Sequence, residues 1–148
     1  MADDSYLGVE ARTLTALGRV VVAAGRIEWL VFALDFHSHG PAKGTLAPMI
    51  KRVRTSSNGS PAGLGEWLTN VKSAMDDRNK LFHSGFAQLD SGPVRIQINS
   101  RSVLHSNDGE IDALAERFAS MFHEGWRYLV EVSDGDIGGV PISEDGVG

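Results

Sequence analysis

The segment that spans residues 76–84, DDRNKLFHS, combines basic, amide and imidazole side chains at helical spacing. Asn79 and His83 are four residues apart and therefore share one face of a helix. At about 100° per residue, Arg78 lies about 140° from His83 around the same helix. Because its side chain is long, Arg78 can reach a phosphate that His83 also contacts. The alternative is that His83 is a satisfied helix-end histidine and that Arg78 pairs in solvent with a neighbouring aspartate.

Helices are predicted to position this segment, since apolar residues recur at helical spacing over residues 9–36, over 64–84 and after Asn107, a good N-cap. A shorter helix is expected over residues 47–55. Residues 86–89 and 94–98 flank a DSGP turn, and the second run alternates between apolar and polar, which predicts a small β-hairpin over residues 86–98 that must lean on the helices. We therefore expect a mainly α fold: an antiparallel bundle of about four helices with a hairpin insertion.

Glycines mark unusual positions in the predicted helices. Gly18 and Gly25 lie inside the first helix, where each costs about 1 kcal/mol relative to alanine. They indicate either a close approach of another helix or a weak point. Gly40 and the proline after it are predicted to end this helix, and Gly85 is predicted to cap the helix over residues 64–84.

The composition is that of one globular domain, because 42% of the 148 residues are hydrophobic and 22% are charged. The absence of cysteine excludes disulfides and thiolate metal sites. No apolar run reaches the roughly 18 residues of a spanning helix, and the N-terminus is acidic rather than signal-like. We expect no membrane contact, a cytoplasmic location, a domain over residues 1–133 and a disordered acidic, glycine-rich tail over residues 134–148.

The charge is unevenly distributed along the chain. The net charge is −5, but residues 1–133 carry 14 basic and 15 acidic side chains, a net of −1. This balance excludes a uniformly basic nucleic-acid coat and leaves room for a local basic patch. No acid lies between Asp35 and Glu66, so this stretch is basic. The side chains in it that we assign to substrate binding are Lys51, Arg52 and Arg54. They suit contacts with RNA phosphates, and the alternative is the solvated face of a short helix.

The arrangement of Arg78, Asn79 and His83 near the end of an apolar helix resembles the Arg-x(4–6)-His signature of HEPN domains, an all-helical nucleotide-binding family. A polar residue, often asparagine, follows the arginine in that family. The sequence Gly-Arg-Ile-Glu, which ends at Glu28, is similar to the Gly-x-x-Glu often found in its first helix. A long first helix, a loop, the motif helix and a closing helix extend the resemblance over most of residues 9–132. The predicted hairpin is an insertion that the minimal fold lacks.

Members of the HEPN family with this motif intact are commonly metal-independent endoribonucleases, and they often serve as toxins in toxin–antitoxin or phage-defence systems. The resemblance implies that His83 moves protons between the ribose 2′-OH and the leaving 5′-oxygen. It implies that Arg78 stabilises the pentacoordinate phosphate and that Asn79 holds His83 or a phosphate oxygen. The neighbouring residues that we assign to substrate binding or to support of the site are Lys80, Glu28 and Ser84.

Two other groups of residues have open roles. Glu28 lies beside the apolar stripe of the first helix, where it either pairs with Arg78 inside the bundle or points to solvent. His37 and His39 could contribute to a metal site, but no cysteine and no nearby acid cluster completes one. We therefore expect no metal and no cofactor, and we favour a solvated loop for the histidine pair.

The partners follow from the resemblance. One motif supplies only one histidine, and HEPN protomers face their motifs together, so we expect a homodimer with a composite site. RNA is the expected substrate, and a cognate antitoxin protein is a further expected partner. A rival hypothesis is a non-catalytic HEPN-like module that binds nucleotide, RNA or protein. The intact Arg78 and His83 favour the enzyme, whereas the near-neutral body favours the module. A plainer rival is a helical dimer with a structural role.

Overall fold

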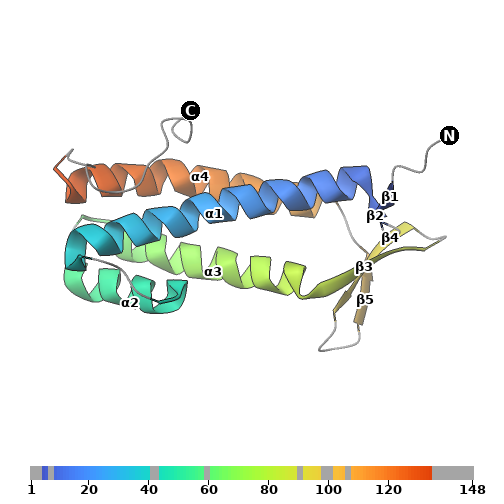
Figure 1. The fold of residues 1–148 in the computed structure, drawn as a ribbon, viewed down its shortest axis with the longest axis horizontal. Coiled ribbons are helices and arrows are strands. Elements are labelled where there is room, and N and C mark those ends of the chain that lie inside the picture. Colours follow the sequence, from blue (N-terminus) through green and yellow to red (C-terminus); the bar gives the residue numbers. More distant parts are fainter. Residues whose placement is uncertain are drawn as a thin grey trace.

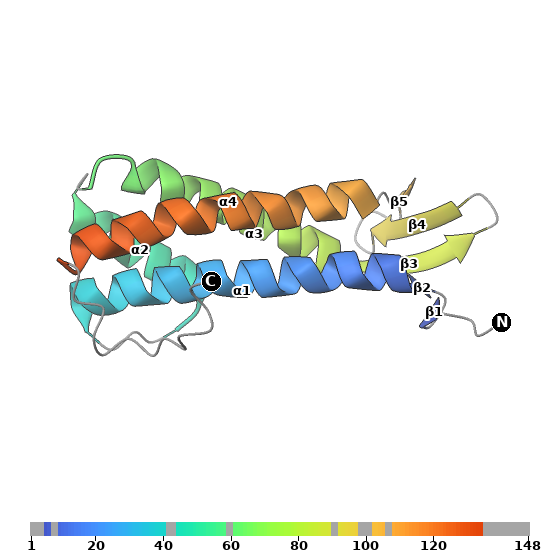
Figure 2. The ribbon, with the colours of Figure 1, turned by 90° about the horizontal axis from the view of Figure 1, so that it is seen from above.

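The computed structural model describes residues 5–6, 9–40, 44–58, 61–89, 92–97, 102–105 and 108–134. Its helices are α1 (Ala11–His39), α2 (Leu46–Ser57), α3 (Leu64–Phe82) and α4 (Asp108–Val132). Figures 1 and 2 show α1, α3 and α4 running side by side along the molecule, while α2 lies beside only one half of it. The prediction of a mainly α fold with four helices is therefore confirmed.

The strands lie at the end of the bundle where α1 begins and α3 ends (Figure 1). They are β1 (Ser5–Tyr6), β2 (Val9–Glu10), β3 (Ser84–Leu89), β4 (Gly92–Gln97) and β5 (Ser102–His105). β1 pairs with β2, and β3, β4 and β5 form an antiparallel sheet in that order. The sequence predicted two paired strands over residues 86–98, whereas the structure pairs three. Asn107 and residues 135–148, which include the predicted tail, lie outside the described residues.

The helix ends differ from the predicted ones by a few residues. α1 continues to His39, and Gly40 follows it with a φ of 79°, as expected for a glycine that ends a helix. α3 ends at Phe82, earlier than predicted, because Ser84 already belongs to β3. His83 takes the C-cap position, so the prediction that Gly85 caps this helix was wrong.

The core is built from one apolar face of each helix, at the spacing that the sequence predicted. Its largest fully buried side chains include Ile27, Leu30 and Leu34 of α1, Val53 of α2, Trp67 and Leu68 of α3, and Phe118 and Tyr128 of α4. The Trp67 indole Nε1 donates a hydrogen bond of 2.9 Å to the Met121 carbonyl oxygen, which ties α3 to α4. Among the described residues, no helix combines the length and the apolar character that crossing a bilayer requires.

At Gly125, α4 packs closely against side chains of α3 and α1. A Cβ atom there would collide with the Trp67 ring and would lie 2.9 Å from Leu30 Cδ1. At Gly18 and Gly25, by contrast, nothing in the described chain lies within 4 Å of the position that a Cβ would take. The close approach that the sequence suggested for these two glycines is therefore not made by any of the described residues.

We predict that Gly125→Ala destabilises the protein by about 1–3 kcal/mol, because an added methyl group overpacks the contact with Trp67. Helix propensity alone predicts the opposite sign, since alanine is better than glycine by about 1 kcal/mol in a helix. Urea unfolding followed by circular dichroism measures the difference. Gly65→Ala is the control, because its Cβ would meet nothing within 4 Å. A Gly125→Ala protein as stable as this control would refute the packing argument.

Candidate functional site

Arg78 joins α3 to α1 through its guanidinium. Its Nη1 donates to Glu28 Oε1 at 2.9 Å, and its Nη2 donates to Asn79 Oδ1 at 3.0 Å. The sequence left open whether Glu28 pairs with Arg78 or points to solvent, and in the structure it pairs with Arg78. Both partners are partly exposed, at 29% for the Arg78 side chain and 43% for that of Glu28. The pair is thus accessible from solvent, and it contributes more to orientation than to stability.

The third nitrogen of the Arg78 guanidinium, Nε, differs from the other two because it lacks a hydrogen-bond acceptor among the described residues. This nitrogen is buried. A buried donor without an acceptor costs about 1–3 kcal/mol, and such atoms in a folded protein call for a specific explanation. Glu28 and Asn79 occupy the two outer nitrogens while Nε faces the protein. Arg78 is therefore a fixed cation whose orientation is set by its neighbours.

His83 lies at the same end of α3, where the helix stops. Its backbone N–H donates to the Asn79 carbonyl oxygen at 2.9 Å, and its side chain is exposed. Asn79 and His83 therefore follow each other one helical turn apart, as the spacing predicted. Ser84 Oγ donates to the Lys80 carbonyl oxygen at 2.7 Å, so Ser84 supports the end of the helix. The Lys80 side chain is exposed on the same turn.

The site faces a part of the bundle that α2 does not cover. α2 has 12 residues against 29 in α1, and it lies beside the other half of the molecule (Figure 1). On the uncovered half the exposed large apolar side chains include Leu14 at 37%, Val21 at 55% and Phe82 at 41%. Leu14, Val21 and Glu28 follow one another at intervals of seven residues, so they share one face of α1. We call the surface formed by Leu14, Val21, Glu28, Arg78, Phe82 and His83 the open seam.

Arg52, predicted to bind substrate, instead holds a buried carboxylate. Its Nε and Nη2 donate to Asp35 at 3.1 and 2.8 Å, and the Asp35 side chain is 0% exposed. His39 Nδ1 lies 3.3 Å from the same carboxylate. The hydrogen bonds with Asp35 raise the pKa of Arg52, so this guanidinium stays charged. Sequence reasoning missed Asp35, although an acid four residues after Val31, in the apolar stripe, was the available signal.

The other basic residues of α2 also lie away from the motif. Arg54 Nη2 donates to Thr69 Oγ1 at 3.0 Å, and Lys51 is exposed. α2 lies beside the half of the bundle that is far from the end of α3 (Figure 2). Hydrogen bonds therefore hold Arg78, Glu28 and Asn79 together, and Lys80 and His83 follow on the last turn of α3. The basic side chains of α2 do not reach this end of α3.

The described residues contain no group of three or more histidine and acidic side chains that could hold a metal ion. The His37 Nε2 atom is buried without a hydrogen-bond partner among these residues, while His39 faces Asp35. The prediction of a solvated loop here was wrong, because both histidines belong to the last turn of α1 and the two have different surroundings. The polar groups of the open seam and of the adjacent Asn79 are an imidazole, a guanidinium, a carboxylate and an amide.

Comparison of the chain with protein-family models, with curated proteins and with solved structures found no match. What the chain does is therefore inferred from its own residues and from the resemblance of its motif.

We predict that Arg52→Ala lowers the melting temperature, because it removes the guanidinium that hydrogen-bonds to the buried Asp35 carboxylate. Differential scanning calorimetry of the two variants Arg52→Ala and Arg54→Ala measures the effect. Arg54 is the matched control, since it is on the same helix and donates to the exposed Thr69 hydroxyl rather than to a buried carboxylate. Equal melting temperatures for the two variants would show that Arg52 has no structural role.

Proposed function

We propose that this protein is a metal-independent endoribonuclease of HEPN-like architecture that acts as a homodimer. The observation that carries the proposal is the fixed Arg78, held by Glu28 and Asn79, beside the exposed His83 on one helix end. The resemblance of this motif to the HEPN signature supports RNA as the substrate. It also favours a toxin of a toxin–antitoxin or phage-defence system, with a cognate antitoxin protein as a partner.

The proposed reaction is an internal transesterification that needs one base and one acid. A neutral imidazole accepts the proton of the ribose 2′-OH, and the oxygen then attacks the adjacent phosphorus. The bond from phosphorus to the 5′-oxygen breaks, and an imidazolium donates a proton to that oxygen. Arg78 stabilises the charge of the pentacoordinate phosphate, and the Asn79 amide nitrogen adds a donor. The products are a 2′,3′-cyclic phosphate and a 5′-OH.

One chain supplies one histidine in this motif, so we assign the second proton-transfer group to His83 of the partner subunit. The open seam supports this arrangement, because Leu14, Val21 and Phe82 expose apolar surface beside the motif. A second copy on the seam would bury these side chains, and burial of apolar surface is the main driving force for association. A two-fold axis there would bring the two motifs to one cleft.

We predict that His83→Ala lowers the cleavage rate by about 10²–10⁴-fold through loss of acid–base catalysis. Arg78→Ala should lower it by about 10²–10³-fold through loss of charge stabilisation, and it should also weaken RNA binding. The measurement is cleavage of mixed RNA in EDTA, with end-group analysis of the fragments.

His123→Ala is the control, because His123 is an exposed histidine on α4. It should cleave like the wild type. Equal cleavage by all the variants would identify a contaminant. Fragments with a 5′-phosphate, or cleavage that stops in EDTA, would rule out this mechanism.

We predict that Val21→Glu halves the mass of the assembly in solution and abolishes cleavage, because a charge on the open seam prevents its burial. Light scattering coupled to size exclusion measures the mass. Val130→Glu is the matched control, since Val130 is an exposed valine at 36% on α4. It should keep both the mass and the activity. An active Val21→Glu protein of unchanged mass would contradict the dimer at the seam.

One observation favours a second candidate, a module that binds nucleotide, RNA or protein without cleavage. The Glu28 carboxylate, 2.9 Å from Arg78, offsets the charge that a phosphate would meet. Wild-type protein that binds RNA in a filter assay, needs Arg78 to do so and leaves the RNA intact would support this candidate over the enzyme.

A further inference from the structure

Glu28 occupies the part of Arg78 that an anion from solvent would use. A guanidinium binds a phosphate best through two parallel N–H groups on one edge. The edge that includes Nε is not available to such a ligand, because Nε is buried. On the outer edge, Nη1 already donates to Glu28 Oε1 at 2.9 Å, and Nη2 donates to Asn79 Oδ1 at 3.0 Å. A phosphate that binds this edge must therefore compete with these two acceptors.

Of the two acceptors, Glu28 is the one that a phosphate displaces more readily. Its side chain is 43% exposed, so the carboxylate regains water when it turns away from Arg78. An ion pair at such exposure is weak, and a phosphate repels the carboxylate because both are negative. Asn79 is neutral, and its amide can rotate so that its nitrogen donates to a phosphate oxygen. Asn79 can thus remain at the site when an anion binds, whereas Glu28 has to leave Arg78.

We propose that Glu28 is a built-in competitor of the RNA phosphate. Its carboxylate pairs with Arg78 in the empty site, and a phosphodiester group must displace it in order to bind. The identity of this ligand rests on the proposed function. The competition leaves only a fraction of the molecules with Arg78 ready for a phosphate, and the apparent affinity falls by that fraction. Glu28 therefore restrains the site until RNA binds.

Glu28→Gln tests the competition, because glutamine keeps an acceptor for Arg78 Nη1 and removes the charge. The probe is a fluorescent RNA in which every ribose carries a 2′-O-methyl group, so the proposed reaction cannot consume it. Fluorescence anisotropy in EDTA should give a dissociation constant about fivefold lower than that of the wild type, the factor that an exposed ion pair can supply. Thermal melts check the fold, and Glu28→Ala is the second variant if Glu28→Gln melts early.

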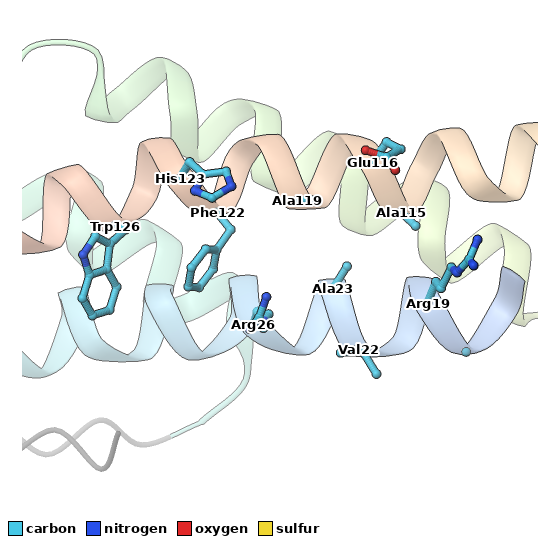
Figure 3. Close-up of a pocket in the computed structure, with 11 residues that line it drawn as sticks. Arg19, Val22, Ala23, Arg26, Ala115, Glu116, Ala119, Phe122, His123 and Trp126 are labelled. Carbon is cyan, nitrogen blue, oxygen red and sulfur yellow. The ribbon is translucent and has the colours of Figure 1, made fainter. Parts of the chain in front are cut away.

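Glu116→Gln is the matched control, because it changes the net charge by the same amount. Glu116 is exposed on α4 and lines a pocket between α4 and α1 (Figure 3). On α1 the same pocket is lined by Arg26, which lies about 160° around the helix from Glu28. Because salt screens distant exposed charges, Glu116→Gln should change the dissociation constant by less than about twofold. An equal gain in both variants would overturn the competition.

The requirement for Arg78 gives a second test. In Arg78→Ala protein the carboxylate has no guanidinium to occupy, so the further change Glu28→Gln should leave the dissociation constant of the probe unchanged. This double-mutant cycle isolates the coupling between the two side chains. A fivefold gain that persists without Arg78 would show that Glu28 acts through its charge alone, and the competition would be wrong.

Cleavage kinetics distinguish a competitor from a residue that positions Arg78 during the reaction. A competitor weakens substrate binding, so Glu28→Gln should lower KM and leave kcat unchanged. A lower kcat at unchanged KM would mean that the carboxylate orients Arg78 in the transition state, and it would overturn the proposal.

The outcomes separate this inference from the proposed function. If the wild type cleaves RNA but Glu28→Gln binds the probe no more tightly, the competitor is wrong and the ribonuclease stands. If Glu28→Gln binds the probe more tightly and neither protein cleaves unmodified RNA, the competitor stands and the catalytic proposal fails. Absence of binding by either protein overturns both.

Discussion

The contact between the Trp67 ring and the backbone of Gly125 fixes the distance between α3 and α4, and the rest of the bundle depends on that distance. The indole Nε1 reaches the Met121 carbonyl oxygen at 2.9 Å only because no Cβ stands at Gly125. Leu30 of α1 packs at the same point. The three long helices therefore meet around one ring, and further along the bundle the Arg78–Glu28 pair joins the last turn of α3 to α1. That last turn contains Arg78.

Polar contacts then tie α1 to each of the other helices. Asp35 holds Arg52 of α2, Glu28 holds Arg78 of α3, and Thr13 Oγ1 donates to Asp108 of α4 at 2.8 Å. The three ties differ in burial. The Asp35 carboxylate is fully buried, so losing its partner is costly, whereas Glu28 and Arg78 are both partly exposed. The tie at the motif is thus the one that a ligand can exchange without breaking the fold.

The periodicity of apolar residues predicted the four helices, and the spacing of Arg78, Asn79 and His83 predicted that they share the end of one helix. These features are local, so a single sequence contains them. The sequence did not predict the roles of Gly125 and Asp35, because each depends on a partner far along the chain: Trp67 for Gly125 and Arg52 for Asp35. It did not predict the open seam either. α3 ends at Phe82 because the next residues form β3, which pairs with β4. Helix propensity carries no information about this pairing.

The open seam exists because α2 is too short to cover the second half of the bundle, and this shapes the chemistry that the motif can do. A longer α2 would bury Leu14, Val21 and Phe82 within the chain and would enclose Arg78 and His83. The short helix leaves these residues for another molecule. Over residues 1–133 the chain has a net charge of −1, and Glu28 offsets Arg78, so long-range attraction of RNA is weak. A site of this kind must act through the orientation of a few fixed donors, and Glu28 and Asn79 supply that orientation for Arg78.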